Sequence, residues 1–459
     1  MGNNRVLFLN GYPLSLSNNK FRFLKGLIVL RFILASIFML LCSAPIAAED
    51  TGVVKRVADA TVLIRANLKH GFAEDRKASG RWIGSGFLID KTKGWIVTNR
   101  HVAGIGPAEL TAQFVDSKKK VVAERVYVDS KHDLAILKID PNELPNSSTV
   151  LDLQCGYRLN RGDKVAAVGH PEGHHFTATL GVLSGQKDLG VDGMVYTTDM
   201  VTEPGSSGSP VILVESGNVI GISTAGYESS DLGLLTRVRD LCPIYELLER
   251  GEDPSRPLMT FQTLIVDGEI SNRVGHVFSG TIALKPGDTI LTVGGELWDP
   301  GQDGELEDNL RRFNDGATLL TIQRDGSEID VELPITKRGS LHIRDWVYFS
   351  GIMLAESPHR DINFRNGSRP GSFVTIQSVD DTHDDAVNLE YDEYSDVISI
   401  DGVEITSLKQ AYDVLKRAES EGRRIPMVAR EWDITPEAIG YQFEHTFSVD
   451  DLSSSFADY

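Results

Sequence analysis

The chain has 459 residues, of which 41% are hydrophobic, and it carries a formal net charge of -19. At roughly 150 residues per domain this length predicts about three domains, because it exceeds what one hydrophobic core serves. The acidic balance excludes nucleic acid and anionic membrane as the main partners, since neither attracts a negative surface.

The first 48 residues contain basic side chains but no Asp or Glu. An uncharged apolar run begins at Phe32 and leads into small residues that end at Ala48, which is typical of a secretory signal peptide spanning residues 1–48. The alternative is an uncleaved membrane anchor over residues 32–48, whose length reaches the lower limit for a transmembrane helix. Both interpretations predict an exported protein.

Cysteine is sparse after this segment, with only Cys155 and Cys242 remaining. A large exported protein needs no disulfide framework. A bridge between a linker and the start of a helix and a pair of buried free thiols are both compatible with these positions.

Short β-rich runs separated by turn residues fill the chain from Val53 to Val238, with no βαβ alternation. This pattern of short strands predicts a β-sandwich or a pair of barrels, and a helix over Arg239–Arg250 is expected to end the domain. The polar stretch Gly251–Pro257 indicates a domain boundary.

Two modules with one plan follow, over residues 257–337 and 340–433. Gly287–Gly295 and Ser395–Val403 are similar strands, and each precedes a helix, expected over Glu305–Asn314 and Leu408–Glu419. An acidic tail is expected over residues 434–459. The acidic stretch from Asp380 to Glu404 is interpreted as a solvated face and not a calcium loop, because it lacks ligands at defined offsets around a glycine turn.

A serine set among glycines occupies Thr202–Val211. Glycines allow a tight turn in which a hydroxyl projects and backbone N–H groups converge as oxyanion donors. Such turns are common, so the functional interpretation depends on a base and a carboxylate elsewhere in the chain.

Both partners precede this loop. His101 follows the apolar strand Trp95–Thr98, and Asp133 opens the apolar run Leu134–Ile139. A histidine base takes the proton of a serine nucleophile, and a buried carboxylate orients that histidine. Each residue alone has a structural explanation, but the three in this order and setting predict a serine hydrolase.

Residues 51–250 resemble a trypsin-fold serine protease of the HtrA/Deg type. The motifs that carry the resemblance are Gly84–Phe87, Thr98–Val102, Asp133–Leu137, Pro204–Pro210 and Val219–Ile222. The resemblance implies an all-β domain of two six-stranded antiparallel β-barrels with the catalytic residues in the cleft between them. The later modules resemble α+β PDZ domains, as in Deg proteins.

Carried over by this resemblance, His101 is the general base, Asp133 orients it, and Ser207 is the nucleophile. The N–H groups of Gly205 and Ser207 form the oxyanion hole. No cofactor or metal is implied. A metal site at the histidines His170, His174 and His175 is the less favoured alternative, because their stretch matches a turn and strand of the fold.

The resemblance also places substrate-binding residues. The segment containing Ser223, Thr224 and Ala225 matches the edge that pairs with an extended substrate. Val201 is expected at the floor of the primary pocket, where an uncharged side chain disfavours Lys or Arg and favours small or aliphatic residues.

Several positions depart from the family pattern. Ser206 stands where Asn is usual and Ser209 where Gly is usual. The position before Ser207 lacks the Asp that pairs with a new N-terminus in trypsin-like zymogens, so we expect regulation through loops, oligomerisation or the later modules. Leu284–Ile290 matches a PDZ domain, but its carboxylate-binding loop is missing, and Tyr348–Ile352 is a degenerate version of that loop.

These observations predict an exported serine endopeptidase, located in the bacterial periplasm, that cleaves unfolded or damaged proteins. Unfolded or misfolded proteins are the expected partners, with peptide C-termini at the PDZ-like modules and assembly into a homo-oligomer. One alternative is a non-cleaving chaperone or scaffold that binds clients through its barrels and modules. Another is a processing protease for one envelope substrate.

Overall fold

The computed structural model describes residues 7–9, 12–14, 49–69, 80–115, 117–129, 131–170, 176–189, 193–226, 232–266, 269–277, 282–300, 306–337, 339–340, 342–343, 345–357, 373–379, 395–432 and 440–455. The chain divides into two compact units, Met1–Val53 and Val54–Tyr459. In the first unit, β1 (Leu7–Leu9) pairs antiparallel with β2 (Tyr12–Leu14). The rest of the predicted signal peptide lies outside the described residues. Among the described helices, none combines the length and apolarity needed to span a bilayer.

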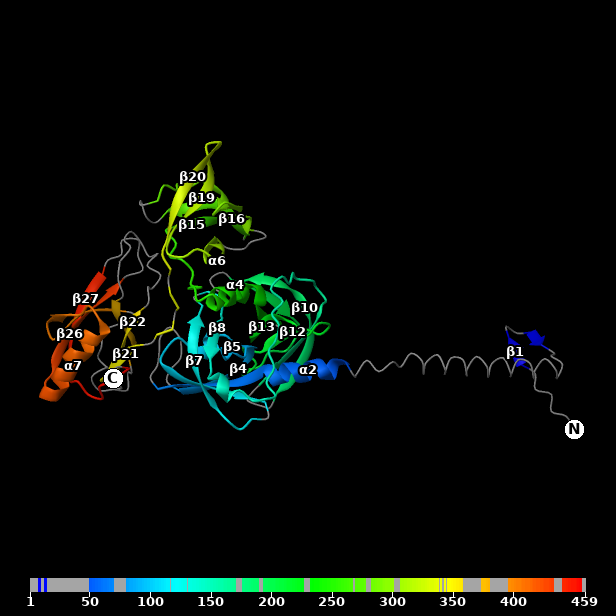
Figure 1. The fold of residues 1–459 in the computed structure, drawn as a ribbon, viewed down its shortest axis with the longest axis horizontal. Coiled ribbons are helices and arrows are strands. Elements are labelled where there is room, and N and C mark those ends of the chain that lie inside the picture. Colours follow the sequence, from blue (N-terminus) through cyan, green and yellow to red (C-terminus); the bar gives the residue numbers. More distant parts are fainter. Residues whose placement is uncertain are drawn as a thin grey trace. The chain divides into compact units, whose positions relative to one another are not determined.

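The first barrel of the second unit is closed in the order β3-β4-β5-β8-β7-β6 (Figure 1). Buried and exposed side chains alternate along its strands, as in β7, where Val121 and Ala123 are buried and Val122 is exposed. The strands are β3 (Thr61–Leu68), β4 (Gly80–Asp90), β5 (Trp95–Thr98), β6 (Ala108–Phe114), β7 (Val121–Val128) and β8 (Ala135–Lys138). The helix α2 (Glu49–Ala60) precedes β3, and the short helix α3 (Arg100–Ala103) follows β5.

The second barrel is also closed, in the order β10-β11-β14-β13-β12-β9, and every pairing in it is antiparallel. Its strands are β9 (Lys164–Gly169), β10 (Thr177–Asp188), β11 (Met194–Thr198), β12 (Pro210–Leu213), β13 (Val219–Gly226) and β14 (Gly233–Arg237). The helix α4 (Val238–Glu249) follows, close to its predicted range. The prediction of two six-stranded antiparallel barrels is confirmed.

A disulfide joins Cys155, in the segment before β9, to Cys242 in α4. Of the two alternatives for these cysteines, the structure therefore has the bridge. It ties α4 to the start of the second barrel across 87 residues of sequence.

The first module after the barrels is a sheet in the order β15-β16-β17-β19-β20, with β18 paired to β17. Its strands are β15 (Phe261–Val266), β16 (Glu269–Val277), β17 (Thr289–Val293), β18 (Glu296–Leu297), β19 (Gly316–Arg324) and β20 (Ser327–Ile335). The helix α6 spans only Leu306–Leu310. It is shorter than predicted because the next N–H groups, of Arg311 and Phe313, bond three residues back and tighten the turn.

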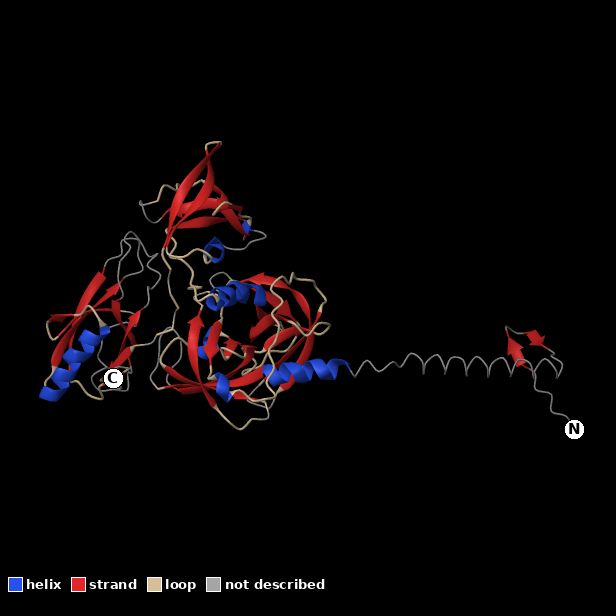
Figure 2. Cartoon of the chain, in the orientation of Figure 1, coloured by secondary structure: helices blue, strands red, loops and turns tan. Residues whose placement is uncertain are grey.

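The second module is a sheet in the order β27-β26-β24-β23-β22-β21-β28, with β25 paired to β24. Strands predominate in it, as in the rest of the chain (Figure 2). Its strands are β21 (Trp346–Phe349), β22 (Ile352–Ser357), β23 (Phe373–Val379), β24 (Asp396–Ile400), β25 (Val403–Glu404), β26 (Ile425–Trp432), β27 (Gly440–Phe447) and β28 (Ser453–Ser454).

The helix of this module, α7 (Leu408–Glu421), buries one apolar stripe against the sheet and ends at Gly422, in the left-handed conformation. Part of the predicted acidic tail over residues 434–459 supplies β27 and β28 of this sheet. Phe447 is fully buried and packs on Phe349, so this part of the tail belongs to the module core.

Candidate active site

Ser207 lies on the loop between β11 and β12, and this loop is held by the first barrel. Ser85, on β4, donates its hydroxyl to the Gly205 carbonyl at 2.8 Å and its N–H to the Ser207 carbonyl at 2.7 Å. The Gly208 N–H donates to the Ser223 carbonyl at 2.7 Å. The nucleophile loop is therefore fixed from both barrels. Ser85 belongs to a family motif in the sequence, but only the structure shows what it contacts.

Glycine is required at position 208 of this loop. Its φ of 88° lies in the left-handed region. A Cβ atom there would lie 1.9 Å from the Ser85 carbonyl oxygen and 2.5 Å from Thr98 Oγ1. The same close approach brings the loop against the buried end of β5, next to the turn that carries the histidine.

His101 lies in the short helix α3, and the buried Asn99 is the residue just before this helix. Its Nδ1 is 2.6 Å from Asp133 Oδ2, and its backbone N–H donates to Asp133 Oδ1 at 2.9 Å. The Asn99 side chain donates to the Asp133 carbonyl at 2.8 Å. Backbone and ring of the histidine are thus both held by one carboxylate, as the sequence predicted for an orienting group.

The side chain of Thr224 also contacts Asp133, and the sequence did not predict this contact. Thr224 Oγ1 donates to Asp133 Oδ2 at 2.5 Å. Burial opposes ionisation of this carboxyl, but the attraction of His101 and the hydrogen bonds from His101 and Thr224 outweigh it. The pKa of Asp133 is lowered from 3.8 to about 2. Asp133 is therefore a carboxylate at neutral pH.

Thr224 also connects this carboxylate to the nucleophile. Ser207 Oγ donates to the Thr224 carbonyl at 2.9 Å. Thr224 was predicted to lie on the edge that pairs with substrate, which stays a prediction, and its side chain contacts Asp133. The sequence signal for this role is a hydroxyl residue in β13, the strand whose backbone carbonyl accepts the hydroxyl of Ser207.

The backbone N–H groups of the loop bear on the predicted oxyanion hole. The N–H groups of Ser206, Gly208 and Ser209 bond to backbone carbonyls of the chain. Within the described part of the protein, the N–H groups of Gly205 and Ser207 have no such acceptor. These are the two predicted oxyanion donors, and Gly205 reaches its conformation through a φ of 96°.

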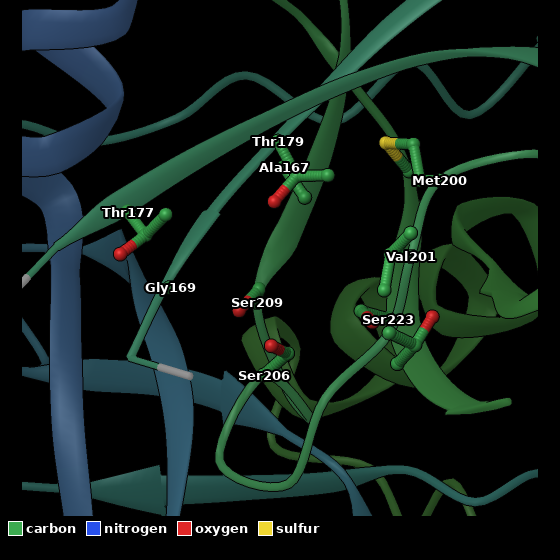
Figure 3. Close-up of a pocket in the computed structure, with 10 residues that line it drawn as sticks. Ala167, Gly169, Thr177, Thr179, Met200, Val201, Ser206, Ser209 and Ser223 are labelled. Atoms are coloured by element: carbon green, nitrogen blue, oxygen red, sulfur yellow. The ribbon is translucent and has the colours of Figure 1, made fainter. Parts of the chain in front are cut away.

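A pocket of about 290 Å³, including its open mouth, lies between β9, β10 and the nucleophile loop (Figure 3). Six of its ten lining residues carry hydroxyls, and none is charged. The lining consists of Ala167, Gly169, Thr177, Thr179, Met200, Val201, Thr202, Ser206, Ser209 and Ser223. Val201 and Ser223 were predicted to bind substrate and meet here. Val201 is 65% exposed, however, so it does not form the buried floor that was expected.

Ser209 fits where glycine is usual because the residue opposite it has no side chain. A Cβ atom on Gly169 would lie 1.9 Å from Ser209 Oγ. That oxygen is buried in the pocket and has no hydrogen-bond partner among the described residues. The unusual serine is thus accommodated by packing, without displacing the loop.

Of the three candidate metal-binding histidines, only His170 is described. Its backbone N–H donates to Ser85 Oγ at 3.1 Å, and Ser85 also binds the loop that carries Ser207. The centroid of its ring lies 4.0 Å from the centroid of the Phe176 ring. His174 and His175 lie outside the described residues, as does the side chain of Ala225.

Comparison with known proteins agrees with this geometry. The family described as trypsin-like peptidase domain matches residues 84–222. This region is a trypsin-like peptidase domain. In sequence the chain is similar to DegP and DegP-like proteases, and in fold it is similar to an HtrA-type protease.

Three relatives show the extent of the similarity. The chain is 36% identical to a probable periplasmic serine endoprotease DegP-like of Halomonas elongata, covering 58% of each chain. It is 28% identical to that of Hahella chejuensis, over 55% of this chain and 56% of the relative. It is 25% identical to the periplasmic serine endoprotease DegP of Escherichia coli, over 61% of this chain and 62% of the relative. The chain thus spans little more than half the length of these relatives.

Solved structures support the fold. The HtrA-type protease AlgW, in a complex with a decapeptide, matches with a TM-score of 0.50 at 21% identity. The match covers 63% of this chain and 98% of that one. The same protease with a tripeptide matches with a TM-score of 0.50 at 22% identity, and the match covers 63% of this chain and 97% of that one.

Proposed function

We propose that this protein is an exported serine endopeptidase that hydrolyses peptide bonds of unfolded or damaged proteins through an acyl-enzyme. The observation that carries the proposal is the continuous set of bonds joining His101, Asp133, Thr224 and Ser207. Its relatives named as periplasmic endoproteases support both the activity and a periplasmic location.

The proposed reaction begins with a rotation of the nucleophile. A serine hydroxyl has one proton, and here that proton is donated to the Thr224 carbonyl. On substrate binding, Ser207 Oγ turns to His101 Nε2, gives it the proton and attacks the carbonyl carbon of the scissile peptide. The negative oxygen that forms accepts hydrogen bonds from the N–H groups of Gly205 and Ser207.

His101 then returns the proton to the leaving amine, and the C–N bond breaks. Water attacks the remaining ester, His101 takes a proton from that water, and Ser207 recovers it when the acid leaves. Asp133 stays ionised throughout, because its pKa of about 2 lies far below neutrality. Its charge stabilises the imidazolium that forms in both halves of the reaction.

Substrate choice follows from the pocket beside the nucleophile. Its lining carries no charge to pair with Lys or Arg, and Gly169 and Ser209 pack closely at one side. We therefore propose a preference for small or aliphatic side chains before the cleaved bond. The two later modules are proposed to be PDZ-like and to bind peptide C-termini, and the protein is proposed to assemble as a homo-oligomer.

The test replaces Ser207 and compares it with a remote serine. Ser207→Ala is expected to abolish cleavage of casein and labelling by a fluorophosphonate, since both require the attacking hydroxyl. Ser216→Ala, in the exposed turn after β12, is the matched control and should retain both. Casein cleavage by Ser207→Ala would refute the mechanism. No labelling of the wild-type protein would favour a non-cleaving chaperone or scaffold.

A further inference from the structure

A buried arginine from the first C-terminal module lies among residues of the peptidase domain. Arg311, which follows α6, is only 2% exposed. Burying a guanidinium stabilises a protein only when it is fully paired. Its Nη2 donates to Asp129 Oδ2 at 2.6 Å, and its Nη1 donates to the Pro254 carbonyl at 2.6 Å and to the Tyr127 hydroxyl at 3.0 Å. Its Nε donates to Asp308 Oδ1 at 3.2 Å.

The first partner of this arginine organises the turn that carries Asp133. Asp129 is fully buried between β7 and β8. Its Oδ1 accepts the N–H groups of Lys131 at 2.9 Å and His132 at 2.8 Å, and its own N–H donates to the Leu134 carbonyl at 2.9 Å. One oxygen of Asp129 thus holds the backbone just before Asp133, while the other is bound to Arg311.

The charge state of Asp129 depends on that contact. Burial disfavours its ionised form, but the attraction of Arg311 and of His132 outweighs burial and holds its pKa well below 3.8. Without the guanidinium, a buried carboxylate would either protonate or turn to other partners. In both cases the acceptor for the His132 N–H would weaken.

The side chain of His132 is held by the same module. Its Nε2 lies 3.0 Å from Asp308 Oδ2, and its Nδ1 lies 3.9 Å from Asp240 of α4. Arg256 also contacts Asp308, at 3.1 Å, and Glu307, at 2.8 Å. Burial opposes protonation of His132, but these carboxylates raise its pKa above 6.5. The residue next to Asp133 is therefore fixed by its backbone and by its ring.

We propose that Arg311 is a positioning residue for Asp133, acting through Asp129 and the backbone of His132. The proposal rests on the function proposed above. Asp133 holds His101 at 2.6 Å, so a small displacement of the turn weakens the orientation of the base. The first C-terminal module thereby completes the active site of the peptidase domain in the same chain, through buried charge and without touching substrate.

The experiment uses the full chain with Arg311→Met, which keeps the length of the side chain and removes its charge. The matched control is Arg312→Met, because the next residue pairs with Glu296 at the surface. Each variant is measured for kcat and KM on a fluorogenic peptide and for its rate of fluorophosphonate labelling from pH 5 to 9. Circular dichroism at the assay temperature shows that each variant is folded.

Arg311→Met is expected to lower kcat and the labelling rate at least 10-fold, with KM changed less than twofold. The acid limb of its labelling profile should shift, because the displaced Asp133 no longer holds the ring of His101 in place. Arg311→Lys should recover part of the rate, and Arg312→Met should match the wild type. A folded Arg311→Met with wild-type kcat and pH profile would overturn the proposal and leave Arg311 a structural residue.

Asp308→Asn provides a second test, in which the carboxylate beside the ring of His132 loses its charge while Asp129 stays paired with Arg311. It weakens the contact with His132 and keeps the shape of the side chain. We expect a labelling rate at least threefold lower with a shifted acid limb, and an unchanged rate and profile would overturn the proposal if Arg311→Met does not fold. A wild-type chain that is never labelled would contradict the proposed function itself, which is a different outcome.

Discussion

Replacing Thr224 with valine removes one hydroxyl from the orienting carboxylate and keeps the shape of the side chain. The lost bond, from Thr224 Oγ1 to Asp133 Oδ2 at 2.5 Å, is made to an ionised group. Such bonds contribute about 1.5–3 kcal/mol. If this contribution is made in the transition state, where the imidazolium is formed, the rate of acylation should fall roughly 10- to 150-fold at about 1.4 kcal/mol per factor of ten.

The substitution should also change the response to acid. The pKa of Asp133 is lowered in the folded protein, so its ionisation stabilises the fold above pH 3.8, and that contribution is lost as the pH falls toward about 2. Without the Thr224 hydroxyl, the folded pKa moves back toward 3.8. The stabilisation from this carboxylate then becomes smaller, and its loss is complete at a higher pH.

The assay is the rate of fluorophosphonate labelling at pH 7, together with denaturant unfolding between pH 2 and 7. Thr149→Val is the control, because it removes a similar bond, to the Arg56 carbonyl at 2.7 Å, that involves none of His101, Asp133 and Ser207. The Thr149→Val variant should have a lower free energy of unfolding than the wild type and an unchanged labelling rate. Equal labelling rates for Thr224→Val and the wild type would refute the assigned role of Thr224.

Two further predictions concern the loop and the disulfide. Gly208→Ala should abolish labelling, because its Cβ would lie 1.9 Å from the Ser85 carbonyl oxygen in a backbone conformation that alanine rarely adopts. Labelling at the wild-type rate would show that the loop moves without consequence. A variant with serine at both Cys155 and Cys242 should lose about 2–5 kcal/mol of unfolding free energy, because the bridge closes a loop of 87 residues. Denaturant unfolding measures this loss, reductant should reproduce it in the wild type only, and equal midpoints for the two proteins would contradict the bridge.

The pocket illustrates where local sequence is a poor guide. The resemblance placed Val201 at its floor, yet this side chain is largely exposed. Four of the ten lining residues come from β9 and β10, which lie earlier in the chain. The fit of Ser209 depends on Gly169, 40 residues before it, and this pairing has no signature in either segment alone.

Short β-rich runs separated by turn residues predicted a β-sandwich or a pair of barrels, and the family resemblance predicted the two six-stranded barrels that the structure confirms. His101 and Asp133 each lie beside an apolar strand and Ser207 lies in a glycine turn, so the signals for the predicted catalytic residues are local. The sequence also predicted α4 and α7, whose apolar side chains recur at helical spacing.

Only the tertiary structure decided which groups hold those catalytic residues. Thr224 reaches Asp133 across 91 residues of sequence, Ser85 reaches Gly205 across 120, and Arg311 reaches Asp129 across 182. Each of these contacts depends on how two distant segments pack, and a hydroxyl or guanidinium carries no sign of its partner in the neighbouring residues. The types and order of the proposed catalytic residues could therefore be predicted from the sequence, but the contacts that position their side chains could not.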